Sequence, residues 1–98
     1  MKNLVKNMEM AINEKIRKYG IANVMLFIEN RSCNFYQMQE VNILKVTNND
    51  TTLEFDTNVD EKSLTLGLNY INIKYDEKSC NAYKFEYENN FTVTICIL

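Results

Sequence analysis

The sequence predicts an α+β domain in which an N-terminal helix packs on an antiparallel β-sheet of about five to seven strands. Apolar residues recur at spacings of three and four over the first twenty positions, and mostly at spacings of two thereafter. Short polar loops separate the successive strands, which is typical of an antiparallel meander. A sheet with this number of strands can also curl into a partial barrel. The 98 residues suffice for one core. We therefore expect a single domain over 1–98, with the helix at about 2–19 and the strands within about 22–98.

The expected helix has a start signal and a stop signal. Asn3 is placed as an N-cap, because its side chain can accept a hydrogen bond from a free N–H group of the first turn. Gly20 suits the left-handed position that ends many helices. The apolar stripe that we expect to cover the sheet comprises Leu4, Val5, Met8, Ala11, Ile12, Ile16 and Tyr19.

The first strands are less regular than the later ones. Residues 24–28 are all apolar, which favours a strand buried on both faces over a second short helix. The pattern in 30–39 leaves helix, strand and loop open. Within 41–46 the apolar positions change phase, so Leu44 and Val46 are expected on the face opposite the preceding apolar residues. Such a slip predicts a β-bulge or burial on both faces.

The later segments alternate between apolar and polar positions. The side chains expected to face the core are Leu53, Phe55, Leu64, Leu66, Leu68, Ile71, Ile73, Tyr75, Tyr83, Phe85, Tyr87, Phe91, Val93, Ile95 and Ile97. Asn48–Asp50 predicts a turn, because Asn and Asp tolerate positive φ and bond their own backbone. Asn89 and Asn90 predict a two-residue type I′ hairpin loop.

The composition excludes several kinds of active site. The chain has no histidine, which removes Ser-His-Asp triads, Cys-His pairs and histidine-based metal sites. Two glycines cannot build a glycine-rich loop around phosphates. We therefore expect no enzymatic activity, no cofactor and no catalytic residues.

The sequence Asp-Glu-Lys-Ser occurs twice, at 60–63 and 76–79. Metal-dependent nucleases use a similar triplet with an upstream acid, here Asp56, to hold Mg²⁺ and steady the developing charge. In those enzymes the triplet lies on a strand, whereas both copies here fall in polar stretches between strands. We expect solvated loop charges and no metal site, and we keep a carboxylate-metal-dependent enzyme as the less favoured alternative.

The charges are divided unevenly along the chain. Residues 1–41 carry a net +2, and residues 42–98 carry five lysines against nine acids, a net −4. Phosphate contact needs clustered Lys and Arg, so we expect no direct binding of nucleic acid. An acidic sheet face instead suits a basic protein surface. The candidate partner-binding residues are the acids Glu54, Asp56, Glu86 and Glu88, together with Tyr36 and Tyr70, which lie outside clear alternation.

These features favour a small non-enzymatic, intracellular protein-binding module. Its sharper form is a phage or mobile-element inhibitor, of the anti-CRISPR or anti-defence type, that occludes a basic surface of a host nuclease or defence complex. The Asn-rich, Lys-over-Arg composition resembles bacterial or phage coding. The alternative from a different class is a structural or assembly protein that forms a homo-oligomer.

The expected location is the cytoplasm of a bacterium or of a phage-infected cell. Three cysteines are an odd number without C-x-x-C spacing, which favours a reducing compartment over a disulfide framework. Cys33 and Cys80 are expected in loops, and Cys96 is expected to be a small buried or half-buried residue. The start of the chain lacks the apolar core of a signal peptide, and no apolar run approaches the length of a membrane helix, so we expect no membrane association.

Overall fold

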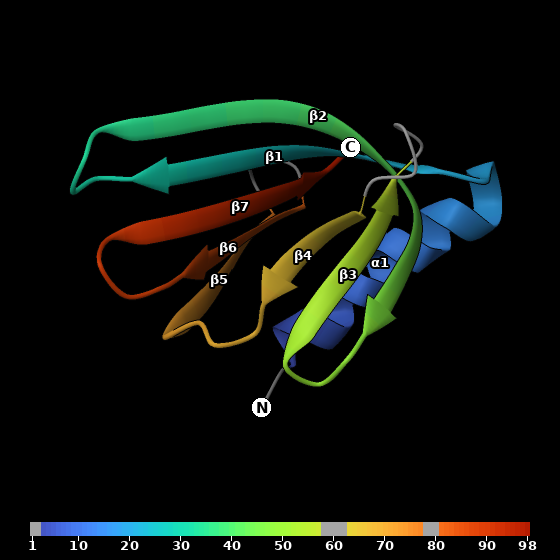
Figure 1. Cartoon of the computed structure of the whole chain (residues 1–98). Helices are drawn as coiled ribbons and strands as arrows, with labels where there is room; N and C mark the ends of the chain where they lie inside the picture. The colour runs from blue at the N-terminus through green and yellow to red at the C-terminus, as the bar shows by residue number, and fades with distance from the viewer. Residues whose placement is uncertain (1–2, 58–62, 78–80) are drawn as a thin grey trace.

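The computed structural model describes residues 3–57, 63–77 and 81–98, and it shows one helix followed by seven strands (Figure 1). The helix is α1 (Leu4–Tyr19). The strands are β1 (Ala22–Asn30), β2 (Phe35–Asn48), β3 (Thr52–Thr57), β4 (Ser63–Gly67), β5 (Asn72–Asp76), β6 (Ala82–Glu86) and β7 (Phe91–Ile97). The predicted α+β class with an antiparallel sheet is confirmed. No helix within these described residues is long and apolar enough to cross a membrane.

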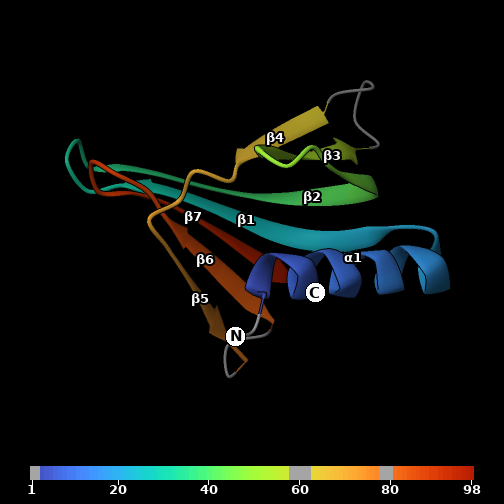
Figure 2. The same cartoon turned by 90° about the horizontal axis from the view of Figure 1, so that it is seen from below.

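All seven strands form one antiparallel sheet in the order β4-β3-β2-β1-β7-β6-β5. The chain therefore follows a meander from β1 to β4 at one edge and resumes at β5 on the opposite edge. Only residues 68–71 connect these edge strands, and this connection spans at most about 18 Å when fully extended. In a flat sheet the edges would lie six strand spacings apart, or about 29 Å. The sheet must therefore curve, as Figure 2 shows, although β4 and β5 do not pair.

The helix begins and ends at the predicted residues. The Asn3 side chain accepts a hydrogen bond from the backbone N–H of Lys6 at 3.0 Å. Gly20 has φ of +77°, a left-handed conformation that glycine adopts without a Cβ clash, and its N–H donates to the carbonyl of Ile16. Tyr19 differs from the expectation: it is 68% exposed, and its ring lies 5.6 Å from the ammonium group of Lys15 instead of packing on the sheet.

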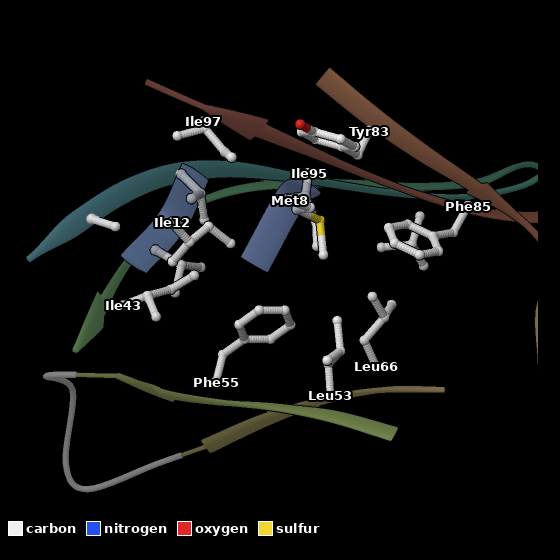
Figure 3. Packing of buried hydrophobic residues seen from close by; sticks show 14 of the residues in the cluster. Met8, Ile12, Ile43, Leu53, Phe55, Leu66, Tyr83, Phe85, Ile95 and Ile97 are labelled. Carbon is white, nitrogen blue, oxygen red and sulfur yellow. The ribbon is translucent and has the colours of Figure 1, made fainter. Parts of the chain in front are cut away.

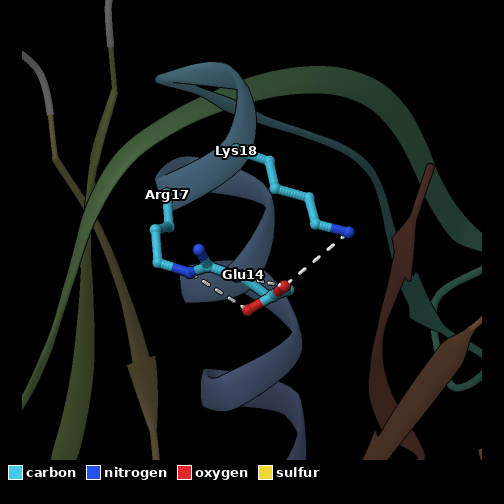
Figure 4. Close-up of polar contacts among 3 residues, drawn as sticks. All are labelled: Glu14, Arg17 and Lys18. Carbon is cyan, nitrogen blue, oxygen red and sulfur yellow. Dashed lines mark hydrogen bonds and ion pairs between the residues drawn. The ribbon is translucent and has the colours of Figure 1, made fainter.

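The solvent-facing side of α1 carries a small cluster of charges (Figure 4). The Arg17 guanidinium donates two hydrogen bonds to the Glu14 carboxylate, the shorter at 2.6 Å. The Lys18 ammonium lies 3.7 Å from the same carboxylate. The hydrogen bond from Arg17 is the main cause that lowers the pKa of Glu14 below its ordinary value.

The phase slip in β2 is a β-bulge. Ile43 pairs with Thr57, but Lys45 pairs with Asp56, so one extra residue is accommodated between them. That residue, Leu44, is 44% exposed. Because the bulge shifts the alternation by one residue, Val46 lies opposite Phe55 and packs against the core on the same face as Ile43. The predicted bulge is confirmed, and the predicted placement of Val46 on the opposite face is wrong.

The turns follow the asparagine signals with one correction. Residues 24–28 lie in β1, and the open segment 30–39 is the β1–β2 hairpin. The backbone N–H of Asp50 donates to the Asn48 side chain at 2.8 Å, and this forms the predicted turn. Asn89 and Asn90 both have positive φ, as a type I′ turn requires. However, Glu86 pairs with Thr92, and the backbone N–H of Tyr87 donates to the carbonyl of Phe91, so the loop between Tyr87 and Phe91 holds three residues, 88–90, instead of two.

The core lies between the inner face of the sheet and α1 (Figure 3). We call the face that packs against α1 the inner face, and the opposite one the outer face. The sheet has two parts, one formed by β1 to β4 and the other by β5 to β7. Met8 and Ile12 of α1 are fully buried between these two parts, where the neighbouring side chains include Phe55 of β3 and Phe85 of β6. The expected inward alternation is followed closely in β3, β6 and β7, whereas Ile71, before β5, is 66% exposed.

Candidate ligand cavity and predicted contact residues

The helix covers only part of the inner face, and a cavity of about 820 Å³ lies on another part of it. Its lining comes from β1, β2, β3, β4 and β7, and from the segments that follow β4 and β6. The apolar lining residues are Val24, Leu26, Ile28, Val41, Ile43, Phe55, Leu64, Leu66, Tyr87, Phe91, Val93 and Ile95. The alternation that builds the core thus also builds this cavity, because both use the same face of the same strands.

Polar side chains lie at the exposed rim of the cavity. Asn69 belongs to the connection between β4 and β5, and Glu88 and Asn89 belong to the loop between β6 and β7. All three are exposed, whereas Val24, Val41 and Ile95 on the cavity floor are buried. The site therefore has an apolar floor and a polar mouth, an arrangement typical of small-molecule pockets.

Tyr87 forms a hydrogen bond between the two parts of the sheet, beside the cavity. Its hydroxyl donates a 2.6 Å hydrogen bond to the carbonyl oxygen of Gly67 at the end of β4. Its ring lies 5.6 Å from that of Phe91, the residue opposite it across the hairpin. Burial raises the pKa of Tyr87 to about 12, and the neighbouring Tyr70 adds to this shift. The hydroxyl is therefore a stable donor at neutral pH.

The four predicted acids do not lie on one continuous surface. Glu54 and Asp56 lie on the outer face of β3, whereas Glu86 lies on the outer face of β6. Strands β3 and β6 are four strand spacings apart, about 19 Å along the sheet, and outward curvature spreads their side chains further. Glu88 follows β6 and lies at the cavity mouth instead. The alternation correctly assigned faces to the strand residues, but the strand order separates them.

Two of these acids lie next to lysines, whose positive charge partly offsets the negative charge of the outer face. Asp56 is directly opposite Lys45 in the sheet. The Glu86 carboxylate lies 3.4 Å from the Lys74 ammonium and accepts a hydrogen bond from Asn72 at 2.9 Å. Burial acts to raise the pKa of Glu86, but the contacts from Asn72 and Lys74 outweigh it, so the pKa lies below its ordinary value.

The two predicted tyrosines occupy different environments. Tyr36 lies on the outer face near the β1–β2 turn and is 56% exposed. Tyr70 is half-buried: its ring packs edge-to-face against Phe85, with centroids 5.4 Å apart. Tyr70 is therefore less accessible than the sequence indicates, because the connection between β4 and β5 folds over the core.

The cysteines differ from one another. Cys33 is free and exposed in the turn after β1, as expected. Cys96 is 5% exposed, which confirms its expected burial, but it is disulfide-bonded. The expectation of thiols without a disulfide framework is therefore wrong for Cys96. Cys80 lies outside the described residues.

The predicted metal motif is only partly within the described chain. Asp60 and Glu61 of the first Asp-Glu-Lys-Ser copy, and Lys78 of the second, lie outside it. Among the residues that the structure describes, no group of three or more Cys, Asp or Glu side chains is placed to hold a metal ion.

The fold and the cavity together define a small α+β protein with a curved antiparallel sheet and a ligand-sized apolar cavity. Comparison with protein-family models, curated proteins and solved structures finds no match for this chain.

The cavity was not among the features predicted from the sequence. Its signal is the surplus of inward-facing apolar positions on seven strands, which exceeds what a single sixteen-residue helix can cover.

Proposed function

We propose that this protein is a non-enzymatic binding protein that holds a small molecule with an apolar body in the cavity on its inner face. The supporting observation is a volume of about 820 Å³ above an apolar floor. Pockets of about 300–1,000 Å³ are the usual size for ligands of this class.

The physical driving force is the removal of apolar surface from water. Leu26, Ile28 and Leu64 line the cavity and are only half-buried, so part of their apolar surface is accessible to a ligand. Covering such surface contributes about 25 cal/mol per Å². In this proposal the curved sheet acts as a partial barrel: α1 closes one part of the inner face, and the ligand covers the rest.

The test uses a fluorescent apolar probe and a matched pair of substitutions. N-phenyl-1-naphthylamine is neutral and gains fluorescence in apolar surroundings, so we expect saturable binding by the parent protein. Ile28→Trp fills the cavity from β1 and is expected to abolish this binding. Phe27→Trp adds the same ring at the adjacent residue on the outer face and is expected to preserve it.

Circular dichroism and urea unfolding show whether both variants remain folded. Absence of saturable probe binding by the parent would overturn the proposal. Equal binding by folded Ile28→Trp and Phe27→Trp would place the site elsewhere and would also overturn it.

A second candidate is the capture of a basic protein surface by the outer face of β3. Glu54 supports this candidate, because its neighbours across the sheet are Thr47 and Thr65, neither of which is charged. The inhibitor hypothesis from the sequence therefore takes a narrower form, in which Glu54 and Asp56 contact a nuclease or defence complex without Glu86. An assembly role is its alternative, since β4 and β5 have unpaired edges in the described chain.

Charge reversal distinguishes these possibilities. Glu54→Lys is expected to weaken capture of a basic partner in a pull-down from a bacterial lysate, with stronger loss at low salt. Glu86→Lys is the matched control on the other part of the sheet and is expected to have little effect. Equal capture by Glu54→Lys and the parent would exclude this surface, and a concentration-dependent mass in sedimentation would favour assembly.

A further inference from the structure

We infer that the ligand of this cavity carries a positively charged head group beside its apolar body. This inference rests on the proposed ligand-binding function. Among the described residues that line the cavity, Glu88 is the one with an ionisable acidic side chain, and none of them is Lys or Arg. The described wall of the cavity therefore contributes one negative charge, at the mouth, and no positive charge.

The carboxylate of Glu88 is available to a ligand. The residue is exposed, and within the described part of the chain it makes no ion pair. Its position separates it from the three acids on the outer face, because the loop between β6 and β7 carries it to the rim of the inner face.

The loop that carries Glu88 is anchored to the neighbouring turn after β1. The Ser32 hydroxyl donates to the carbonyl of Asn89 at 3.3 Å, and the Asn90 amide donates to the Ser32 hydroxyl at 3.1 Å. The backbone N–H of Arg31 donates to the carbonyl of Asn90 at 3.2 Å. These contacts restrain the backbone beside Glu88, so less conformational freedom is lost when a ligand binds.

An amphipathic cation fits both parts of this site. Its apolar body would displace water from the floor, while its head group would remain at the mouth, hydrated and close to the carboxylate. The side-chain oxygen of Asn69 at the rim is a further acceptor for an ammonium group. An anionic head group would meet the charge of Glu88 with no Lys or Arg among the described lining residues to compensate it.

The experiment compares three molecules with the same eight-carbon chain and different head groups. Octylammonium, octanol and octanoate compete with N-phenyl-1-naphthylamine for the parent protein at pH 7 and low salt. We expect octylammonium to bind about threefold to tenfold more tightly than octanoate, with octanol between them, as exposed charge pairs contribute only modestly. The difference should shrink in 1 M NaCl, where the screening length is about 3 Å.

A substitution assigns the preference to Glu88. Glu88→Gln is expected to bring the three affinities within about twofold of one another, because it keeps the shape and removes the charge. Glu40→Gln makes the same change at an exposed residue on the outer face of β2 and is expected to keep the parent's preference.

The outcomes separate this inference from the proposed function. Octanol or octanoate binding as tightly as octylammonium would overturn the cationic preference while leaving the cavity as a ligand site. A preference that survives in Glu88→Gln would also overturn the inference. Failure of the probe to bind the parent at all would overturn both proposals.

Discussion

The hydroxyl of Tyr87 donates a hydrogen bond of 2.6 Å to the carbonyl oxygen of Gly67 and so joins the end of β6 to the end of β4. Strand β4 lies at one edge of the sheet, and β6 lies next to the edge strand β5 on the other side. The edge strands β4 and β5 do not pair with each other. The Tyr87 side chain therefore connects two strands that no backbone hydrogen bonding of the sheet connects. The contact also borders the cavity, since both residues line it.

Tyr87→Phe tests the energetic contribution of this contact. The ring packing on Phe91 is retained, whereas the carbonyl of Gly67 loses its side-chain donor. We expect the free energy of unfolding to fall by about 0.5–1.5 kcal/mol, the usual net contribution of one such hydrogen bond. Urea unfolding at pH 7 measures it. An unchanged midpoint and slope would show that water replaces the bond without cost.

Stability should decline at alkaline pH because of Tyr87. Its pKa is about 12 in the folded chain and about 10 when unfolded, so the folded state binds the proton more tightly. The stabilisation is fully present below pH 10 and is lost as pH rises from about 10 to about 12. Burial also raises the pKa of Tyr83, which adds to the decline.

The matched measurement is the difference in unfolding free energy between the parent and Tyr87→Phe at pH 8 to 11.5. Lysine deprotonation affects both proteins alike, so the difference isolates Tyr87. We expect the parent's advantage to decrease above pH 10. A constant difference over this range would contradict the raised pKa.

Phe85→Ala and Lys84→Ala test the assignment of faces in β6. Phe85 is fully buried and contacts the ring of Tyr70, so its truncation is expected to cost about 3–5 kcal/mol. Lys84, on the outer face, is half-buried and lies opposite Lys74 in β5, and its removal should change stability by less than about 0.5 kcal/mol. Denaturant unfolding measures both. Similar small losses would mean that the two faces are reversed.

Asn3→Ala tests the start of α1. The Asn3 side chain accepts the hydrogen bond from the N–H of Lys6, and losing such a cap costs about 0.5–2 kcal/mol. Asn3→Ser should retain most of the stability, because a serine hydroxyl can accept the same bond. Asn7→Ala is the control at an exposed position within α1, where alanine is the better helix former. Thermal unfolding is sufficient, and equal melting temperatures for Asn3→Ala and the parent would argue against the cap.

Local patterns in the sequence determined the elements of this protein and the face on which most side chains lie. Asn3 and Gly20 mark the ends of α1, because capping depends on the residue and its immediate backbone. The change of phase within β2 marked the bulge, since the alternation of side chains has a strict period of two. The asparagines before β7 adopt positive φ where the sequence indicated a hairpin.

Only the tertiary structure decided which strands are neighbours and what their faces enclose. The pairing of β1 with β7 joins segments at opposite ends of the strand region, and no local pattern encodes it. The strand order separates Glu54 from Glu86, the connection between β4 and β5 half-buries Tyr70, and the loop after β6 carries Glu88 to the mouth of a cavity. The physical reason is that periodicity assigns a side chain to one side of its own strand, whereas strand order and curvature follow from the packing of the whole core.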